Sequence, residues 1–316
     1  MLRTLRGLSG FISIERGFML FAISVAATFL LEGKFAWQEA TYVGLLVFCG
    51  WSAVDAINNV CDAGLDTKSD PSRAQYTKHL GRSGLVICLI LCALTLGLGI
   101  ATLTPLVVVF ILLAGVAGLL YSVPPFRLRQ TICKPVVNFC VGAFPVLIVA
   151  ALSNRFSGIW SLVFVVGLAT AINSLWEDLA DYGSDLESGA RTIPIVLGLR
   201  RGLYATIVGG YCLFPFMVLV GLLFHLSILY YIILFSLTAY ISIRLVLERS
   251  LLFGSTYNEK AVLKLAQTLA KDFVIIAVVF STSLMFSAIM KYQELTFWNQ
   301  IALSVMPVRF SDLSCI

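Results

Sequence analysis

The chain has 316 residues, of which 59% are hydrophobic and only 12% are charged. A soluble domain carries about 25% charged residues, so this composition excludes a soluble protein and indicates an integral membrane protein. The net charge of +5 does not indicate nucleic-acid binding, because membrane topology explains the distribution of the basic residues.

Nine apolar runs along the chain are long enough to span a bilayer, which requires about 20 residues. The 44 positions between Arg82 and Arg127 contain no charged residue, and Thr104 and Pro105 divide them into two spans. The fold class expected is all-α, a polytopic membrane protein forming a single domain over residues 1–316. Transmembrane helices are predicted over residues 12–31, 40–61, 84–102, 105–122, 134–153, 157–177, 202–223, 226–247 and 272–291.

The basic residues indicate the orientation of these helices. With a cytoplasmic N-terminus, 18 of the 22 Lys and Arg residues fall on the cytoplasmic side, and basic residues concentrate on that side of membrane proteins. We therefore expect the N-terminus inside and the C-terminus outside. The opening stretch "MLRTLRGLSGFISIERGF" has no uninterrupted apolar core, so no signal peptide is expected.

The cysteines and histidines show no arrangement typical of a metal site. The eight cysteines form no CxxC pair and lie mostly in apolar helices, where they are packing residues. His79 and His225 are the two histidines of the sequence, which leaves little basis for a histidine-bound zinc or haem.

Carboxylates, in contrast, gather in two short windows. Nine of the 17 Asp and Glu residues fall within residues 55–70 and 177–187. A spacing of four residues places side chains on one helical face, so Asn58, Asp62 and Asp66 form one row. The second row consists of Asn173, Glu177, Asp181 and Asp185. Each row is predicted at the cytoplasmic end of a transmembrane helix.

The two windows also resemble each other. "NNVCDAGLD" and "EDLADYGSD" share the pattern polar, polar, x, x, Asp, x, x, x, Asp, and 119 residues separate their corresponding aspartates. An even number of spans lies between them, which indicates a parallel repeat. We therefore predict two four-helix pseudo-repeats followed by a ninth helix, with the two acidic rows facing each other.

Facing carboxylates near lipid need compensation, because burying each charge costs several kcal/mol. Carboxylates without histidine or thiolate favour a hard cation, and Mg²⁺ is typically held by a few carboxylates together with phosphate oxygens of a substrate. The rows therefore predict a Mg²⁺-diphosphate site near the cytoplasmic face. Basic residues on the same side can neutralise a diphosphate, although topology alone would also place them there. They are Lys68, Arg73, Arg127, Arg129, Lys134 and Arg191.

Three motifs together resemble the UbiA superfamily of intramembrane prenyltransferases. The family motif NxxxDxxxD at the end of the second helix is matched by Asn58, Asp62 and Asp66. The stretch "DYGSDLESGARTIPIVLG" is similar to the family's second motif, a DxxxD followed by a glycine, a basic residue and a threonine. The stretch "YSVPPFRLRQTICKPVVN" is similar to the family's YSPP segment, which leads to a lysine and an asparagine.

The resemblance implies a nine-helix bundle around a central cavity that opens sideways to lipid. It also implies Mg²⁺-dependent transfer of an isoprenyl chain from a prenyl diphosphate to an aromatic or other lipophilic acceptor. The implied metal ligands are Asp62, Asp66, Asp181 and Asp185, with Asn58 beside them. The implied substrate-binding residues are Lys134, Arg191, Arg73, Tyr121 and Asn138. Asp55 and Glu177 join them from their own positions, as acids that can take the proton that an acceptor loses. Asp70 and Ala74 depart from the family pattern, since Arg and Pro are common there, and Glu177 stands where Asn or Asp is often found.

Three other activities use similar residues. A terpene cyclase of the same fold would capture the allylic cation with a double bond of its own chain. A secondary transporter would also use intramembrane acids, but these acids cluster at one face and not at the bilayer midplane. A CDP-alcohol transferase would carry one acidic motif with a DGxxAR core, which is absent from this sequence.

Overall fold

The structure is a computed structural model that describes residues 2–33, 36–64, 67, 70–254 and 257–305, with the backbone alone described for residues 2–5 and 294–305. Within these ranges the chain forms helices and no strand. Nine of the helices there are long and apolar enough to cross a membrane, which confirms the predicted all-α class. They are α2 (Ile14–Glu32), α3 (Trp37–Asp62), α5 (Arg82–Ala101), α6 (Pro105–Ser122), α7 (Lys134–Leu152), α8 (Ile159–Ala180), α11 (Leu199–Leu223), α12 (Ile228–Leu247) and α14 (Glu259–Val305).

The largest departure from the predicted boundaries is at the last span. Helix α14 begins at Glu259, well before the expected start at residue 272. The intervening turns carry Lys260, Lys264 and Lys271, which ended the apolar run but do not end a helix. Lysine is a good helix former, and an acidic residue in the first turn favours the N-terminal end of the helix dipole.

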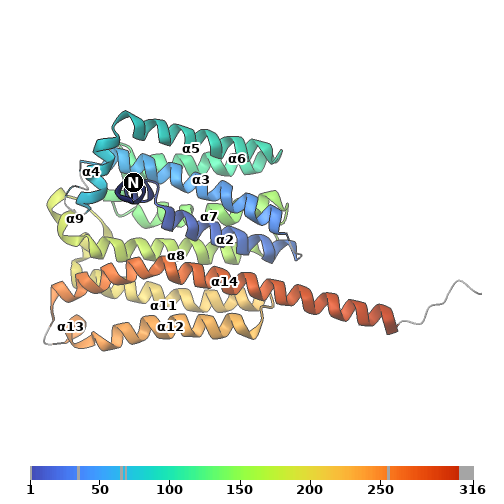
Figure 1. Ribbon diagram of the computed structural model, residues 1–316. Helices are drawn as coiled ribbons and strands as arrows, with labels where there is room; N and C mark the ends of the chain where they lie inside the picture. The colour runs from blue at the N-terminus through green and yellow to red at the C-terminus, as the bar shows by residue number, and fades with distance from the viewer. Residues whose placement is uncertain (1, 34–35, 65–66, 68–69, 255–256, 306–316) are drawn as a thin grey trace, which may run out of the picture.

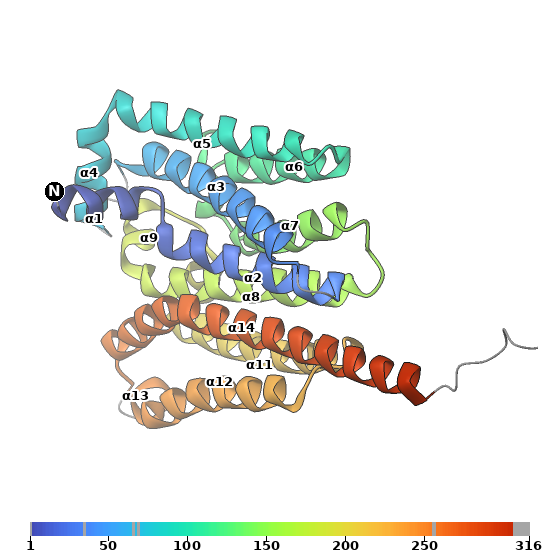
Figure 2. The same ribbon diagram turned by 45° about the vertical axis from the view of Figure 1, so that its right-hand side comes forward.

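The short helix α1 (Leu2–Phe11) precedes the first span. Other short helices connect the spans: α4 (Pro71–Leu80), the 3₁₀ turn η1 (Leu128–Gln130), α9 (Tyr182–Ser188), α10 (Ile193–Leu197) and α13 (Arg249–Phe253). Figures 1 and 2 show α4, α9, α13 and the N-terminus at the same end of the bundle. The unexpected helix α1 packs against α4, where a Cβ at Gly7 would collide with the ring of Tyr76. Asp70 caps α4 by accepting a 3.1 Å hydrogen bond from the backbone N–H of Arg73. A capping role explains the acid at this position.

The burial of the spans repeats along the chain. The buried share is 56%, 50%, 22% and 17% for α2, α3, α5 and α6, and 50%, 56%, 22% and 17% for α7, α8, α11 and α12. The first two helices of each unit therefore form the centre of the bundle. The other two expose apolar side chains such as Leu89 and Ile228, which suits contact with lipid. This pattern agrees with two four-helix units.

Close packing between α7 and α8 brings together two charged residues of the second half of the site. A Cβ at Gly142 would lie 2.7 Å from the carbonyl oxygen of Val166, so only a glycine allows this approach of the backbones. The first residue of α7, Lys134, consequently lies beside the last turn of α8, which carries Asp178.

Candidate active site

The middle residue of the first acidic row is a buried carboxylate that contacts two arginines. Asp62, the last residue of α3, is 0% exposed. Arg129 Nη1 in η1 donates a hydrogen bond to Asp62 Oδ2, and Arg127 Nη2 lies 3.4 Å from Asp62 Oδ1. Two cations supplied by the segment after α6 thus neutralise the end of α3.

The other members of this row have different environments. Asn58 Oδ1 accepts a 2.9 Å hydrogen bond from Ser122 Oγ, at the end of α6. This bond ties α3 to the segment that carries the arginines. Asp66, the expected third member, lies outside the described residues.

The second acidic row is more open to solvent. Asp181 follows the last residue of α8 and is exposed, whereas Asp185 in α9 is half-buried. Burial raises the pKa of the Asp185 carboxyl, the nearby Lys134 and Arg129 lower it, and the charge of Asp181 raises it. Arg129 also contacts Asp62, so one guanidinium acts on both rows. This arrangement supports the prediction that the rows face each other.

A network of charged side chains, of which Lys134 and Asp178 are buried, lies one turn deeper. Lys134 Nζ donates a hydrogen bond to Asp178 Oδ1 and lies 4.0 Å from Glu177 Oε2. Arg16 Nη2 in α2 forms a 2.7 Å ion pair with Glu177 Oε1. Buried charges are costly unless they are paired, and here each has a partner of opposite sign. The network joins α2, α7 and α8.

Three predicted substrate ligands have protein partners in this structure. Asp55 Oδ2 accepts hydrogen bonds from Ser13 Oγ and from Asn59 Nδ2, which anchors the joint between α1 and α2. Arg73 Nε lies 3.5 Å from Asp70 Oδ2. Asn138 Nδ2 donates a 3.0 Å hydrogen bond to the carbonyl oxygen of Lys134.

Two further predicted ligands border the network. Tyr121 is half-buried, and the charges of Lys134, Glu177 and Arg129 act on its phenol group. The side chain of Arg191 is exposed, while its backbone N–H donates a 2.8 Å hydrogen bond to the carbonyl oxygen of Gln130. The loop after α9 is thereby fixed to the segment after α6.

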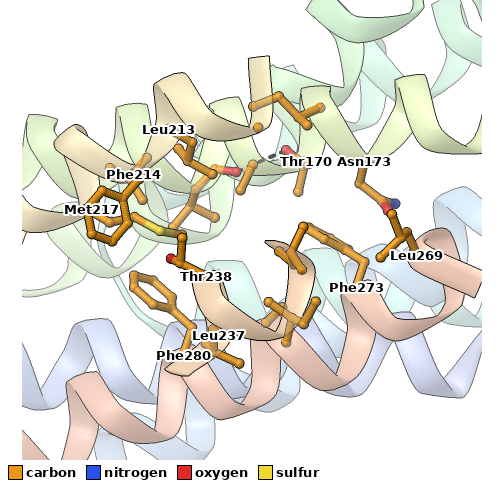
Figure 3. A pocket seen from close by; sticks show the side chains of 18 of the residues that line it. Thr170, Asn173, Leu213, Phe214, Met217, Leu237, Thr238, Leu269, Phe273 and Phe280 are labelled. Atoms are coloured by element: carbon orange, nitrogen blue, oxygen red, sulfur yellow. Dashed lines mark hydrogen bonds between the residues drawn. The ribbon is translucent and has the colours of Figure 1, made fainter. Parts of the chain in front are cut away.

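Two apolar cavities of about 150 and 370 Å³ lie beside this network, and the second reaches the roughly 300 Å³ of a small ligand pocket. The first lies between α2, α8, α11, α12 and α14. Figure 3 shows Thr170 and Asn173 on α8 at this cavity, together with Phe273 and Phe280 of α14. The second lies between α3, α5, α6 and α7 and includes Leu20 of α2. A small polar pocket shares residues with both cavities.

Comparison with known proteins identifies this arrangement. Residues 19–252 match the UbiA prenyltransferase family. The chain belongs to the UbiA prenyltransferase family. A digeranylgeranylglyceryl phosphate synthase of Halobacterium salinarum is 27% identical over 206 residues, which cover 63% of this chain and 73% of that protein. The corresponding synthase of Natronomonas pharaonis is 24% identical over 183 residues, covering 58% of this chain and 65% of that protein.

Solved UbiA structures share the fold. A UbiA homologue of Archaeoglobus fulgidus bound to GPP and Mg²⁺ has a TM-score of 0.63 at 17% identity, covering 87% of this chain and 99% of that one. A homologue of Aeropyrum pernix K1 has a TM-score of 0.65 at 15% identity, covering 88% and 98%. Together with the family match, the nine apolar helices of the described ranges make this protein an integral, multi-pass prenyltransferase.

The donor set of the prenyltransferase suits a hard cation. Within the described ranges, no three His, Cys, Asp or Glu side chains lie close enough together to form a metal site. Asp66, a predicted metal ligand, lies outside these ranges. Asp62, Asp181 and Asp185 offer only carboxylate oxygens, which Mg²⁺ prefers. Burial and Asp181 raise the pKa of Asp185, so an added cation would relieve unfavourable negative charge there.

Several residues of the site gave little or no signal in the sequence. Arg127 and Arg129 were indistinguishable from topological cations, and Asp178 was one acid among several in its window. Arg16, close to the start of the first span, is compatible from sequence alone with a membrane anchor or with a site residue. Trp51, which lines the small polar pocket, had no sequence feature that marks it.

Proposed function

We propose that this prenyltransferase transfers an isoprenyl chain from a prenyl diphosphate to a lipophilic acceptor in a Mg²⁺-dependent reaction. The observation that carries this proposal is the position of Arg129, which contacts Asp62 and acts electrostatically on Asp185. The two acidic rows therefore serve one site. Apolar cavities beside that site suit the hydrocarbon parts of the substrates.

The diphosphate would bind at the end of the bundle that carries the acidic rows, and the isoprenyl chain would extend between the helices. Asp62, Asp66, Asp181 and Asp185 would hold the metal, which neutralises part of the diphosphate charge. Lys134 is the central cation of the network, because it is 8% exposed and close to both Asp178 and Glu177. The remaining proposed contacts come from Asn58, Arg191, Arg73 and Tyr121.

The reaction we infer is ionisation followed by capture. Fixed positive charges stabilise the departing diphosphate, and preorganised electrostatics of this kind is usually the largest contribution to catalysis. The allylic cation at C1 would lie in a largely apolar region, which excludes water. Glu177 and Asp55 are the candidate bases for the proton that the acceptor loses.

The acceptor class is supported by the relatives, whose names describe synthases of digeranylgeranylglyceryl phosphate. We propose an acceptor with a substantial apolar part, because two separate apolar cavities adjoin the site. We also propose that the site faces the cytoplasm, since 18 of the 22 basic residues lie on the side of the N-terminus.

The test is a product assay with purified protein in lipid. Prenyl diphosphates of several chain lengths are combined with aromatic, quinone-precursor, tetrapyrrole and glycerophosphate acceptors, with Mg²⁺ or with EDTA. We expect a prenylated acceptor with Mg²⁺ and none with EDTA. A cyclic hydrocarbon or alcohol formed from the donor alone would instead assign a terpene cyclase, and equal activity in EDTA would refute the metal site.

A further inference from the structure

Asp62 is a proposed metal ligand whose carboxylate is bound by cations of the protein itself. It is 0% exposed. Arg129 Nη1 donates a hydrogen bond to Asp62 Oδ2, and Arg127 Nη2 lies 3.4 Å from Asp62 Oδ1. A carboxylate oxygen ligates a metal through the same lone pairs that accept hydrogen bonds. A metal ion and the guanidinium groups therefore compete for this carboxylate.

The two arginines are held differently, and Arg127 is the more firmly fixed. Its Nη2 also donates a 3.2 Å hydrogen bond to the carbonyl oxygen of Cys61. Its backbone N–H donates to the carbonyl oxygen of Val123, and its own carbonyl oxygen accepts from the N–H of Gln130. Its φ of 40° lies in the left-handed region, which a non-glycine residue rarely adopts unless its surroundings fix it. Arg127 is therefore an anchor of the segment after α6.

Arg129 acts on both acidic rows. Its side chain is 24% exposed, so the guanidinium reaches the surface while it contacts Asp62. Burial raises the pKa of the Asp185 carboxyl, and Lys134 and Arg129 lower it, so Arg129 is close enough to act on the second row as well. The guanidinium fork binds a carboxylate or a phosphate with the same planar geometry. A diphosphate held between the rows would offer Arg129 an alternative partner.

We propose that the Arg129 guanidinium moves from Asp62 to the diphosphate when the prenyl diphosphate binds, and that this exchange frees Asp62 to ligate Mg²⁺. This inference rests on the proposed function and specifies how the substrate and the metal depend on each other at that site. The diphosphate takes the cation and the metal takes the carboxylate, so each ligand favours binding of the other. Coupling of this kind is reciprocal. No covalent bond changes in the exchange.

The test is a double-mutant cycle in binding, which isolates the coupling between two residues. The probe is geranyl S-thiolodiphosphate, an analogue of geranyl diphosphate with sulfur in place of the oxygen on C1. It is titrated calorimetrically, in EDTA, into the purified protein in lipid nanodiscs. In the wild type the analogue has to displace Arg129 from Asp62. Asp62→Asn weakens that competition, so we expect its Kd to fall by about tenfold, the value of one charged hydrogen bond.

The two arginines give opposite expectations, which makes Arg127 the matched control. In the Arg129→Gln background, Asp62→Asn should change the Kd by less than about twofold, because no exchangeable guanidinium remains. In the Arg127→Gln background, Asp62→Asn should still lower the Kd by about tenfold. A general effect of removing one negative charge would instead be similar in both backgrounds.

A second measurement does not depend on the Asp62 variants, and it decides the question if they fail to fold. Mg²⁺ titrated alone should bind Arg129→Gln about tenfold more tightly than the wild type, whereas Arg127→Gln should change the Mg²⁺ affinity by less than about threefold. With saturating analogue, the difference between Arg129→Gln and the wild type should disappear, because Asp62 is then free of Arg129 in both proteins.

The failure of the exchange and the failure of the proposed function give different results. Equal effects of Asp62→Asn in the two arginine backgrounds would overturn the exchange and leave the proposed function intact. A Mg²⁺ affinity of Arg129→Gln no higher than that of the wild type would do the same. If the wild type bound no analogue even with Mg²⁺, the proposed function would be refuted and the exchange with it.

Discussion

The two halves of the bundle carry equivalent acidic motifs in different environments. Asp62 and Asp181 correspond across the 119-residue repeat. Asp62 is fully buried and contacts Arg127 and Arg129, whereas Asp181 is exposed. The segment after α6 supplies both arginines, and it lies between the two motifs in the sequence. An internal repeat therefore provides two similar acidic rows, while a single connecting segment between the repeats provides shared cations.

The same asymmetry recurs one turn deeper. The positions equivalent to Asn58 and Asn59 are Glu177 and Asp178. In the first half these positions are neutral, and Asn59 donates a 2.8 Å hydrogen bond to the carbonyl oxygen of Phe11. In the second half they are charged and paired with Arg16 and Lys134. The first half therefore anchors the N-terminal segment, and the second half holds the buried cation.

The largest expected difference between the halves concerns Asp62 and Asp181. We expect Asp62→Ala and Asp181→Ala each to lower Mg²⁺-dependent diphosphate release by about 10²- to 10³-fold, because each removes a carboxylate that we propose as a metal ligand. Asp62→Ala should also cost about 2 kcal/mol of folding free energy, since it leaves two partly buried arginines without their carboxylate.

Asp181→Ala should change stability by less than about 0.5 kcal/mol, as for other exposed sites. Diphosphate release and thermal unfolding in detergent measure the two effects. Glu39→Ala, an exposed acid in the first turn of α3 at the other end of that helix, is the control and should retain both. Equal destabilisation by the two aspartate variants would contradict the difference in burial.

A second prediction uses substitutions that make the inner turn of the second half neutral, as it is in the first half. Lys134→Met leaves Asp178, which is 0% exposed, without its cation and should destabilise the protein by about 3 kcal/mol. Adding Asp178→Asn, which copies the neutral Asn59, should restore most of that stability but none of the activity. Thermal unfolding of the single and double variants tests this expectation, which fails if the double variant is no more stable than Lys134→Met.

The smallest expected effect is a pH dependence at Asp185. Its pKa is raised in the folded protein, chiefly by burial, so the folded state binds this proton more tightly than the unfolded state. The resulting stabilisation is present below the unfolded pKa and is lost as the pH rises through the folded pKa.

In EDTA, lowering the pH from about 7 to about 4 should therefore raise the unfolding temperature of the wild type relative to Asp185→Asn by about 1 °C. Mg²⁺ should oppose this trend, because metal binding requires the deprotonated carboxylate. Differential scanning fluorimetry of both proteins across this range is the measurement. A relative change of opposite sign in EDTA would contradict the raised pKa.

Local patterns in the sequence predicted the helices and the acidic rows. A bilayer requires about 20 apolar residues per span, so composition alone identified nine spans. A spacing of four residues placed Asp181 and Asp185 one turn apart, and the backbone bond from Asp185 N–H to the Asp181 carbonyl oxygen, at 2.9 Å, agrees with that register. Helix α1 was missed because its polar residues interrupt any apolar run.

Only the tertiary structure decided which charges are buried and with what they pair. Asp62 and Arg129 are 67 residues apart, and Arg16 and Glu177 are 161 apart, so no local spacing relates them. Trp51 of α3 and Asn173 of α8 line one small pocket although they are far apart in the sequence. The sequence by itself determined the spans and the chemistry of the acidic rows, since both follow from bilayer thickness and helical periodicity. Packing between distant helices determined the ion pairs and the cavities.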